Sequence, residues 1–303
     1  MAEPSTSTAT VSDFEAPPTA GFGRAQLLWA ALRRKPLGAA SAAVIAMLVL
    51  TAILADVIAP YDPLATQPEI RLSKPSRDHF FGTDDIGRDV FSRIVHGARI
   101  SLWVGLLAVG IGTMAGMLIG LVCGYWEGRL DLMIQRVMDA LMAIPGLVLA
   151  LAIVSVLKPN TTNAMLAIAI VIIPGNSRIV RGAVLSTKQN RYVEAAQALG
   201  CGHPRIIVTH ILPNVTAPIL IIASIWFGNA ILIEATLSFL GLGTQPPTPS
   251  WGLMLSSTGR AFMEQAPWLA IFPGLAISLA VLGFNLFGDT LRDAWDPKLR
   301  RQG

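Results

Sequence analysis

The chain has 303 residues, of which 53% are hydrophobic and only 14% are charged. Soluble domains carry about 25% charged residues, so this composition excludes an ordinary soluble globular protein and indicates an integral membrane protein. The net charge of +4 does not indicate nucleic-acid binding, because the basic residues are scattered between apolar segments. The four histidines show no zinc-ligand spacing, so neither a metal nor a cofactor is expected.

The N-terminal residues, 1–36, are expected to form a cytoplasmic and largely disordered tail. The first part of this tail is rich in Ser, Thr, Pro and Ala and contains no Lys or Arg. A signal peptide is excluded, because no charged region precedes an early apolar run. Arg33, Arg34 and Lys35 directly precede the first apolar run, which indicates that the N-terminus stays in the cytoplasm.

The first apolar run, 37–59, is long enough to cross a membrane, since about 20 apolar residues span the hydrocarbon core. A polar external segment follows at 60–99 and carries six basic and six acidic residues. Its stretch 81–93 contains several Asp residues but lacks the alternating spacing and terminal Glu of a calcium-binding loop. We therefore expect a helix N-cap there, followed by an amphipathic helix on the membrane surface.

The second span, expected at 100–124, carries a glycine at every fourth position. Such a repeat places the glycines on one face of a helix, where a second helix packs closely. Chance does not readily account for four glycines at this spacing. The helix-packing residues are Gly112, Gly116, Gly120 and Gly124.

Proline and glycine interrupt the next two spans. Span three, expected at 137–157, contains Pro145-Gly146, and span four, which starts near residue 164, contains Pro174-Gly175-Asn176. Interruptions of this kind free backbone groups that need a protein or water neighbour. They are equally consistent with the wall of a cavity, which makes Asn176 a candidate pathway residue, and with purely structural kinks.

A less apolar segment, 185–215, separates spans four and five. Apolar residues recur at helical spacing before Gly200, which is suited to a left-handed helix cap. Pro204 is suited to the first turn of a second helix. The segment therefore predicts a short helix, a tight turn and another helix, with small alanines on an exposed shoulder. The residues of this segment that we single out, called here its marked residues, are Glu194, Ala195, Ala196, Gly200, His210 and Pro213.

Span five, expected at 217–243, contains the polar residues Asn229 and Glu234. An ionisable residue at membrane depth is a candidate pathway or intersubunit residue, and the alternative is a structural ion pair or hydrogen bond. No basic residue in another expected span suits Glu234 as a partner. We therefore expect its partner in another chain or in water. Span six covers 268–287.

The predicted architecture is all-α, with six transmembrane helices. The helix at 37–59 precedes a core of five helices at 100–290, and a short tail follows at 291–303. Six spans place both termini on one side of the membrane, together with the segment 185–215. Fifteen of the 23 Lys and Arg residues fall on that side. The positive-inside rule therefore places both termini in the cytoplasm.

The segment 185–215 resembles the EAA loop of ABC-importer permeases, in its Glu-Ala-Ala, its Gly200 and its closing Leu-Pro. In that family the loop docks in a groove of the cytoplasmic ATPase, which implies that the marked residues couple the chain to an ATPase. His210 stands where the general pattern has an aliphatic residue, and the peptide-importer branch often carries His there. The stretch Gly-Thr-Asp-Asp-Ile-Gly-Arg-Asp, 82–89, resembles a signature of the C-type permeases of dipeptide, oligopeptide and nickel importers.

The resemblance covers about 33–300 and implies a type I ABC-importer permease of the bacterial cytoplasmic membrane. The implied partners are a homologous B-type permease subunit, two ATP-binding subunits and a periplasmic or lipid-anchored solute-binding protein. The chain contains no Gly-Lys pair, which excludes a P-loop. The chain is thus not expected to be an enzyme, and ATP and Mg are expected to bind to the partner subunits.

The expected function is ATP-driven import of di- or oligopeptides or peptide-like solutes. A nickel chelate or a glutathione-like solute remains open, because specificity in this family lies mainly in the binding protein. A secondary transporter that uses Glu234 as its proton or cation site is the alternative from another class. Such carriers usually show inverted repeats and several intramembrane charges, whereas this sequence shows no internal repeat and one mid-span carboxylate.

Overall fold

A computed structural model describes residues 36–256 and 262–295 of the chain. The tail expected at 1–36 therefore lies outside the described residues except for its last one. Most of the tail expected at 291–303 also lies outside them. The described part is helical apart from turns, loops and one isolated β-bridge, so the predicted all-α class is confirmed.

Five helical segments are long and apolar enough to cross a membrane. Many large hydrophobic side chains on these segments are exposed, which suits a lipid environment rather than water. The five segments are α2 (Pro36–Ile53), α4 (Val90–Trp126), α7 (Thr161–Lys188), the run His203–Phe239 that ends in α10 (Leu212–Phe239), and α13 (Trp268–Trp295). The shorter helices are α3 (Ala55–Ile58), η2 (Pro68–Ile70), α5 (Gly128–Met142), α6 (Gly146–Leu157), α8 (Arg191–Ala198), α9 (His203–Ile206) and α11 (Trp251–Met254).

The expected third span is not one straight helix. Helices α5 and α6 meet at a bend of 92°, and they make a sixth span only if the bent pair is counted as one. Pro145 lies at the break, as the N-cap of α6. Proline restricts the residue before it and cannot donate a helical hydrogen bond, so the helix stops there. The 12 residues of α6 span about 18 Å, which is shorter than the hydrocarbon core.

Helix α4 is longer than the span expected at 100–124. The carboxylate of Asp89 accepts a hydrogen bond from the backbone N–H of Ser92 (2.7 Å) and caps the helix at Val90. From there 37 residues continue without a break, a length of about 55 Å. The N-cap is thus present, but the expectation of a separate surface helix after it is wrong, because residues 90–99 are the first turns of α4.

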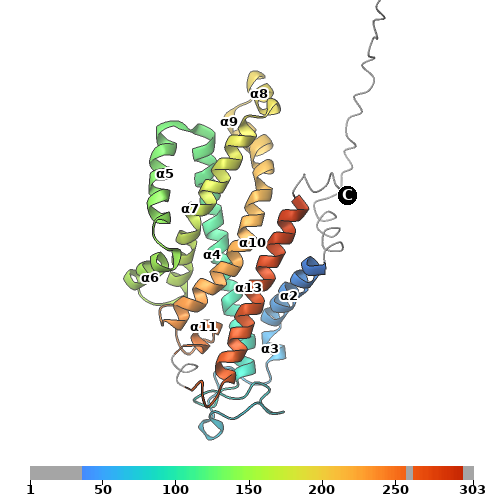
Figure 1. Ribbon diagram of the computed structural model, residues 1–303, viewed down its shortest axis with the longest axis vertical. Helices are drawn as coiled ribbons and strands as arrows, with labels where there is room; N and C mark the ends of the chain where they lie inside the picture. Colours follow the sequence, from blue (N-terminus) through green and yellow to red (C-terminus); the bar gives the residue numbers. More distant parts are fainter. Residues whose placement is uncertain (1–35, 257–261, 296–303) are drawn as a thin grey trace, which may run out of the picture.

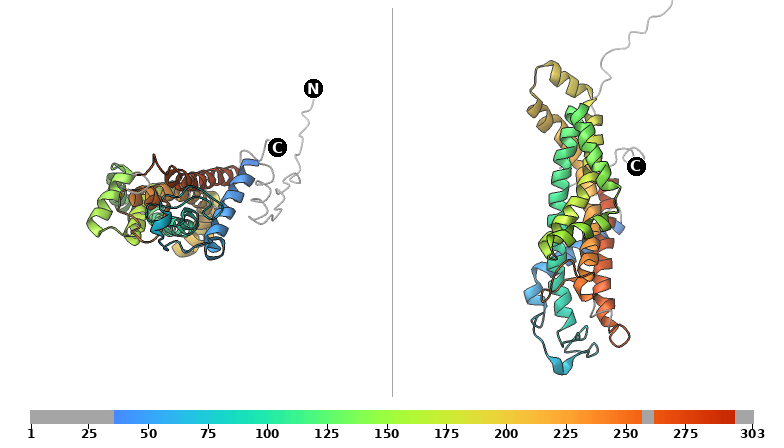
Figure 2. Two further views of the ribbon diagram at one scale, coloured as in Figure 1. Left: turned by 90° about the horizontal axis from the view of Figure 1, so that it is seen from below. Right: turned by 90° about the vertical axis from the view of Figure 1, so that its left-hand side faces the viewer.

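Helices α4 and α7 form the most extensive pair and pack side by side along the long axis of the molecule (Figure 1). One apolar core lies between α4, α6, α7 and α10, and a second lies between α2, α4, α10 and α13. Helices α8 and α9 stand at one end of the molecule, and the irregular segment between α3 and α4 stands at the other (Figure 2). Charge distribution in the sequence assigns the first end to the cytoplasm and the second to the exterior.

Candidate functional site

The segment between α7 and α10, called here the α8–α9 loop (residues 189–206), folds as its local residues require. Helix α8 ends at Ala198, and Gly200 follows with φ of +77°. The N–H of Cys201 donates to the carbonyl of Ala196 (3.0 Å), and that of Gly200 donates to the carbonyl of Gln197 (2.9 Å). This pair of bonds is a Schellman cap, in which glycine adopts the left-handed conformation without strain.

The second helix of the loop continues into the membrane. Helix α9 joins α10 through a π-helical turn at Ile207–Ile211 (η3). Pro213 has no N–H to donate to the carbonyl of Thr209, and its ring crowds that carbonyl, which favours a wider turn. The predicted second helix therefore begins at His203 and runs without a break through the π-turn into α10.

The α8–α9 loop has an inner and an outer face. Val193 and Ile206 are buried and pack against α4, α7 and α10. Ala196 belongs to this inner face with an exposed fraction of 7%, so the expectation that both alanines lie on an exposed shoulder is wrong for Ala196. Glu194 and Ala195 are exposed.

Large apolar side chains also lie on the outer face of the loop and of the π-turn. Leu199 is 84% exposed, Val208 is 62% exposed and Tyr192 is 45% exposed. The ring of Tyr192 lies 6.1 Å from that of His210, measured between centroids. Pro213 is exposed just beyond the π-turn. Exposed apolar residues on a segment outside the membrane indicate a surface that a partner covers.

The glycines of α4 lie against α7 of the same chain. A Cβ atom on Gly112 would lie 2.7 Å from the carbonyl oxygen of Ala169, and one on Gly116 would lie 2.7 Å from the Cβ of Asn176. The same atom on Gly124 would lie 2.8 Å from the Cβ of Val184, and on Gly120 it would meet the carbonyl oxygen of Ser177. These positions leave no room for a side chain unless the helices separate.

Glu234 is fully buried and is surrounded by hydroxyl groups. Its carboxylate accepts hydrogen bonds from Ser238 (2.8 Å), Thr244 (3.3 Å) and Ser101 (3.3 Å). The expectation of a partner in another chain or in water is wrong, because these hydroxyls belong to the same chain. They connect α10 with α4 and with the loop before α11, and this arrangement fits a structural role.

The other two polar residues expected in the spans lie apart from Glu234. Asn176 is fully buried, and its amide donates to the hydroxyl of Thr113 in α4 (2.9 Å). Thr113 and Ser101 are about 18 Å apart along α4, so Asn176 and Glu234 do not form one site. Asn229 donates to a carbonyl of its own helix, that of Ile225 (3.3 Å).

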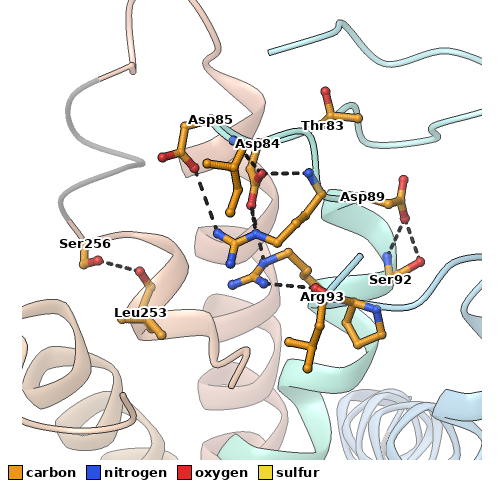
Figure 3. Close-up of polar contacts among 12 residues, drawn as sticks. Thr83, Asp84, Asp85, Asp89, Ser92, Arg93, Leu253 and Ser256 are labelled. Carbon is orange, nitrogen blue, oxygen red and sulfur yellow. Dashed lines mark hydrogen bonds and ion pairs between the residues drawn. The ribbon is translucent and has the colours of Figure 1, made fainter. Parts of the chain in front are cut away.

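The sequence did not reveal a buried ion-pair cluster at the outer end of α4 (Figure 3). Asp84 accepts hydrogen bonds from the side-chain Nε of Arg88 (2.6 Å) and from two backbone N–H groups. Arg93 places its Nε 3.7 Å from the same carboxylate and donates to the carbonyl of Pro63 (3.1 Å). We call Asp84, Arg88 and Arg93 the outer ion-pair cluster.

The outer ion-pair cluster holds the external segment on α4 and lines a cavity of about 110 Å³ against Leu253 and Leu269. Near it, Trp251 donates from its indole to the carbonyl of Ile94 in α4 (3.0 Å), which fixes α11 on the same helix. No group of side chains suited to a metal ion is found in the part of the chain that the structure describes.

Comparison with known families gives two matches that together cover most of the chain. Residues 116–301 match the model of the binding-protein-dependent transport system inner membrane component. Residues 23–75 match the model of the N-terminal TM domain of oligopeptide transport permease C.

Three curated relatives are similar over nearly their full length. The dipeptide transport system permease protein DppC of Alkalihalophilus pseudofirmus is 47% identical over 269 residues, which are 89% of this chain and 88% of the relative. The probable D,D-dipeptide transport system permease protein DdpC of Escherichia coli is 44% identical, with coverage of 91% and 92%. The glutathione transport system permease protein GsiD of Escherichia coli is 46% identical, with coverage of 90% of each chain.

A solved structure shares the fold. The MetNI methionine ABC transporter, in inward-facing conformations, matches with a TM-score of 0.56 at 15% identity. The match covers 68% of this chain and 98% of the other. The fold of most of this chain thus occurs in an ABC transporter.

Proposed function

Because this chain belongs to the family of binding-protein-dependent transport system inner membrane components, we propose that it is the C-type permease subunit of an ATP-driven importer of small peptides. A member of this family is a multi-pass, non-catalytic permease subunit of the inner membrane. Membership also implies that the chain works with an ATPase and a binding protein. The finer assembly proposed is a heterodimer with a B-type permease, two ATP-binding subunits and one binding protein.

The observation that carries the choice of solute is the similarity to three permeases named for a dipeptide, a D,D-dipeptide and glutathione. These solutes share amide bonds and free carboxylates. A short peptide or a peptide-like solute is therefore the proposed cargo, and a nickel chelate is the competing one. A gradient-driven carrier is disfavoured, since the family depends on binding proteins and Glu234 is enclosed by hydroxyls of its own chain.

The α8–α9 loop is the proposed contact with the ATPase. Its outer face combines Leu199 and Tyr192 with the exposed charges of Glu194 and Arg191, and such a mixed surface suits a specific protein contact. Its inner face is packed against α4, α7 and α10, and its second helix is continuous with α10. Closure of the ATPases on ATP would move the loop and thereby tilt α10.

Reconstitution of the complete transporter in liposomes tests this function. We expect uptake of a labelled dipeptide that requires ATP and the binding protein and is insensitive to an uncoupler. Unlabelled dipeptide should compete in excess, whereas a nickel chelate should not; glutathione competition would place the solute class nearer to the glutathione relative. Uptake that collapses with the uncoupler at constant ATP would contradict the proposal.

A further inference from the structure

A polar contact fixes the α8–α9 loop to α4, and the sequence alone does not predict this contact. Tyr125 lies near the inner end of α4 and is only 4% exposed. Its hydroxyl is 2.7 Å from Nδ1 of His203, which is a hydrogen-bond distance. The two rings also meet edge to face, with 5.5 Å between centroids. His203 is the first residue of α9, so this contact holds the point at which the loop turns into α10.

A lysine joins α7 to the same point. The Nζ of Lys188, the last residue of α7, donates to the backbone carbonyl of Tyr125 (2.8 Å) and to the carboxylate of Glu127 (2.8 Å). The same ammonium lies 5.5 Å from the centre of the Tyr125 ring, which is within the range of a cation–π contact. We call Tyr125, Glu127, Lys188 and His203 the inner clamp.

The inner clamp adds a directional hydrogen bond to the contact between the α8–α9 loop and α4, which is otherwise apolar. The loop passes its movement to α10 through the chain itself, because α9 and α10 are continuous. To α4 it is connected through packed side chains such as Val193 and Ile206. Apolar packing is non-directional and permits sliding, whereas a hydrogen bond depends on distance and angle. The Tyr125–His203 bond therefore resists a rotation of the loop relative to α4.

The far end of α4 carries the outer ion-pair cluster and the anchor of α11. Helix α4 contains no proline over about 55 Å, and its glycines lie close against α7. A displacement of its inner end is thus carried to Arg93 at its outer end. We propose that the inner clamp is a positioning element that passes movement of the α8–α9 loop to α4 and, through α4, to the outer ion-pair cluster. This inference rests on the proposed function.

The test uses the complete transporter in liposomes with Tyr125→Phe, His203→Ala and the double variant. Tyr61→Phe is the matched control, because it also removes a tyrosine hydroxyl but from the external segment. For Tyr125→Phe, which changes a buried residue of α4 outside the α8–α9 loop, we expect full recovery of the ATPases on purification and unchanged basal ATP hydrolysis. Solute uptake per ATP hydrolysed should fall about five-fold, the factor that one hydrogen bond of ordinary net strength represents.

Two further comparisons separate positioning from a general loss of structure. The double variant should be no worse than the poorer single variant, because the two changes remove the same bond. His203→Asn should restore uptake per ATP, since an amide atom of Asn lies about where Nδ1 lies in His. A merely structural contact would not change the number of ATP molecules hydrolysed per solute.

Several results would overturn the inference. Uptake per ATP in Tyr125→Phe equal to that of Tyr61→Phe would show that the bond carries no movement. A fall in uptake that matches a loss of bound ATPase would assign the clamp to docking instead. Failure of the wild-type chain to retain any ATPase would contradict the proposed function itself, and the inference with it.

Discussion

Gly120→Ala and Gly110→Ala are the same substitution on the same helix, and the structure predicts opposite effects. A Cβ atom on Gly110 would meet no atom within 4 Å. Because alanine favours a helix over glycine, this change should stabilise the protein by up to about 1 kcal/mol. A Cβ atom on Gly120 would meet the backbone carbonyl of Ser177, the Cβ of Val180 at 2.8 Å and the backbone nitrogen of Arg181 at 3.0 Å.

The atoms that face Gly120 belong mostly to the backbone of α7, so no side chain can turn away to make room. Carbon atoms rest at about 3.5–4.0 Å, and α4 and α7 must therefore separate by roughly 1 Å. Overpacking of this kind costs about 1–3 kcal/mol. The gain in helix propensity applies to both variants and cancels between them, so they should differ by the overpacking cost of about 1–3 kcal/mol in the free energy of unfolding.

The assay is the unfolding of the purified chain in mixed micelles by a denaturing detergent, followed by tryptophan fluorescence. Gly120→Ala should unfold at a lower detergent fraction than the wild type, and Gly110→Ala at the same or a higher one. Equal midpoints for the two variants would refute the close approach of α7 to the glycine face of α4. Gly120→Leu should also lower the yield of the assembled transporter.

Three further predictions concern the loop, the buried carboxylate and the outer ion-pair cluster. Ala195→Asp and Gly200→Asp should leave membrane levels of the chain normal but weaken recovery of the ATPases on purification. At Gly200 the left-handed backbone adds strain of about 1–2 kcal/mol. Full recovery of the ATPases in both variants would show that the loop is not the docking element. Glu234→Gln should retain most ATP-driven uptake, because the amide still accepts hydrogen bonds, and complete loss with normal expression would assign the carboxylate a role in transport. Arg93→Met should destabilise the external segment by about 1–3 kcal/mol, since it removes one partner of buried Asp84. Unchanged resistance of that segment to added protease would show that Arg93 does not hold it on α4.

Local signals in the sequence predicted the features that depend on neighbouring residues. Gly200 has the left-handed backbone expected for a helix cap, and Pro204 lies in the first turn of α9. Asp89 is the N-cap of α4, and an N-cap was expected within the stretch 81–93. Each of these features is decided within about four residues of chain, which is the range over which capping and turn rules act.

Features that depend on residues far apart in the chain could not be predicted from the sequence. The Tyr125–His203 contact joins residues 78 apart in sequence, and the Ser101–Glu234 bond joins residues 133 apart. The inward position of Ala196 likewise depends on the helices that pack against it. A proline such as Pro145 signals a break, but it does not give the angle of 92° or show that α6 packs on α7.

The π-turn at Ile207–Ile211 is, in effect, a one-residue insertion in the register of a long helix. Deleting one of its residues would restore α-helical geometry and leave the spans in place. Because the π-turn takes up its extra residue by widening one turn, the α8–α9 loop would keep nearly the same direction around the axis of α10. Deleting a residue from the α-helical part of α10 would instead turn the loop by about 100° around that axis, and Leu199 would point in a new direction. The π-turn therefore lets the chain carry one extra residue while the outer face of the loop keeps its direction relative to the spans.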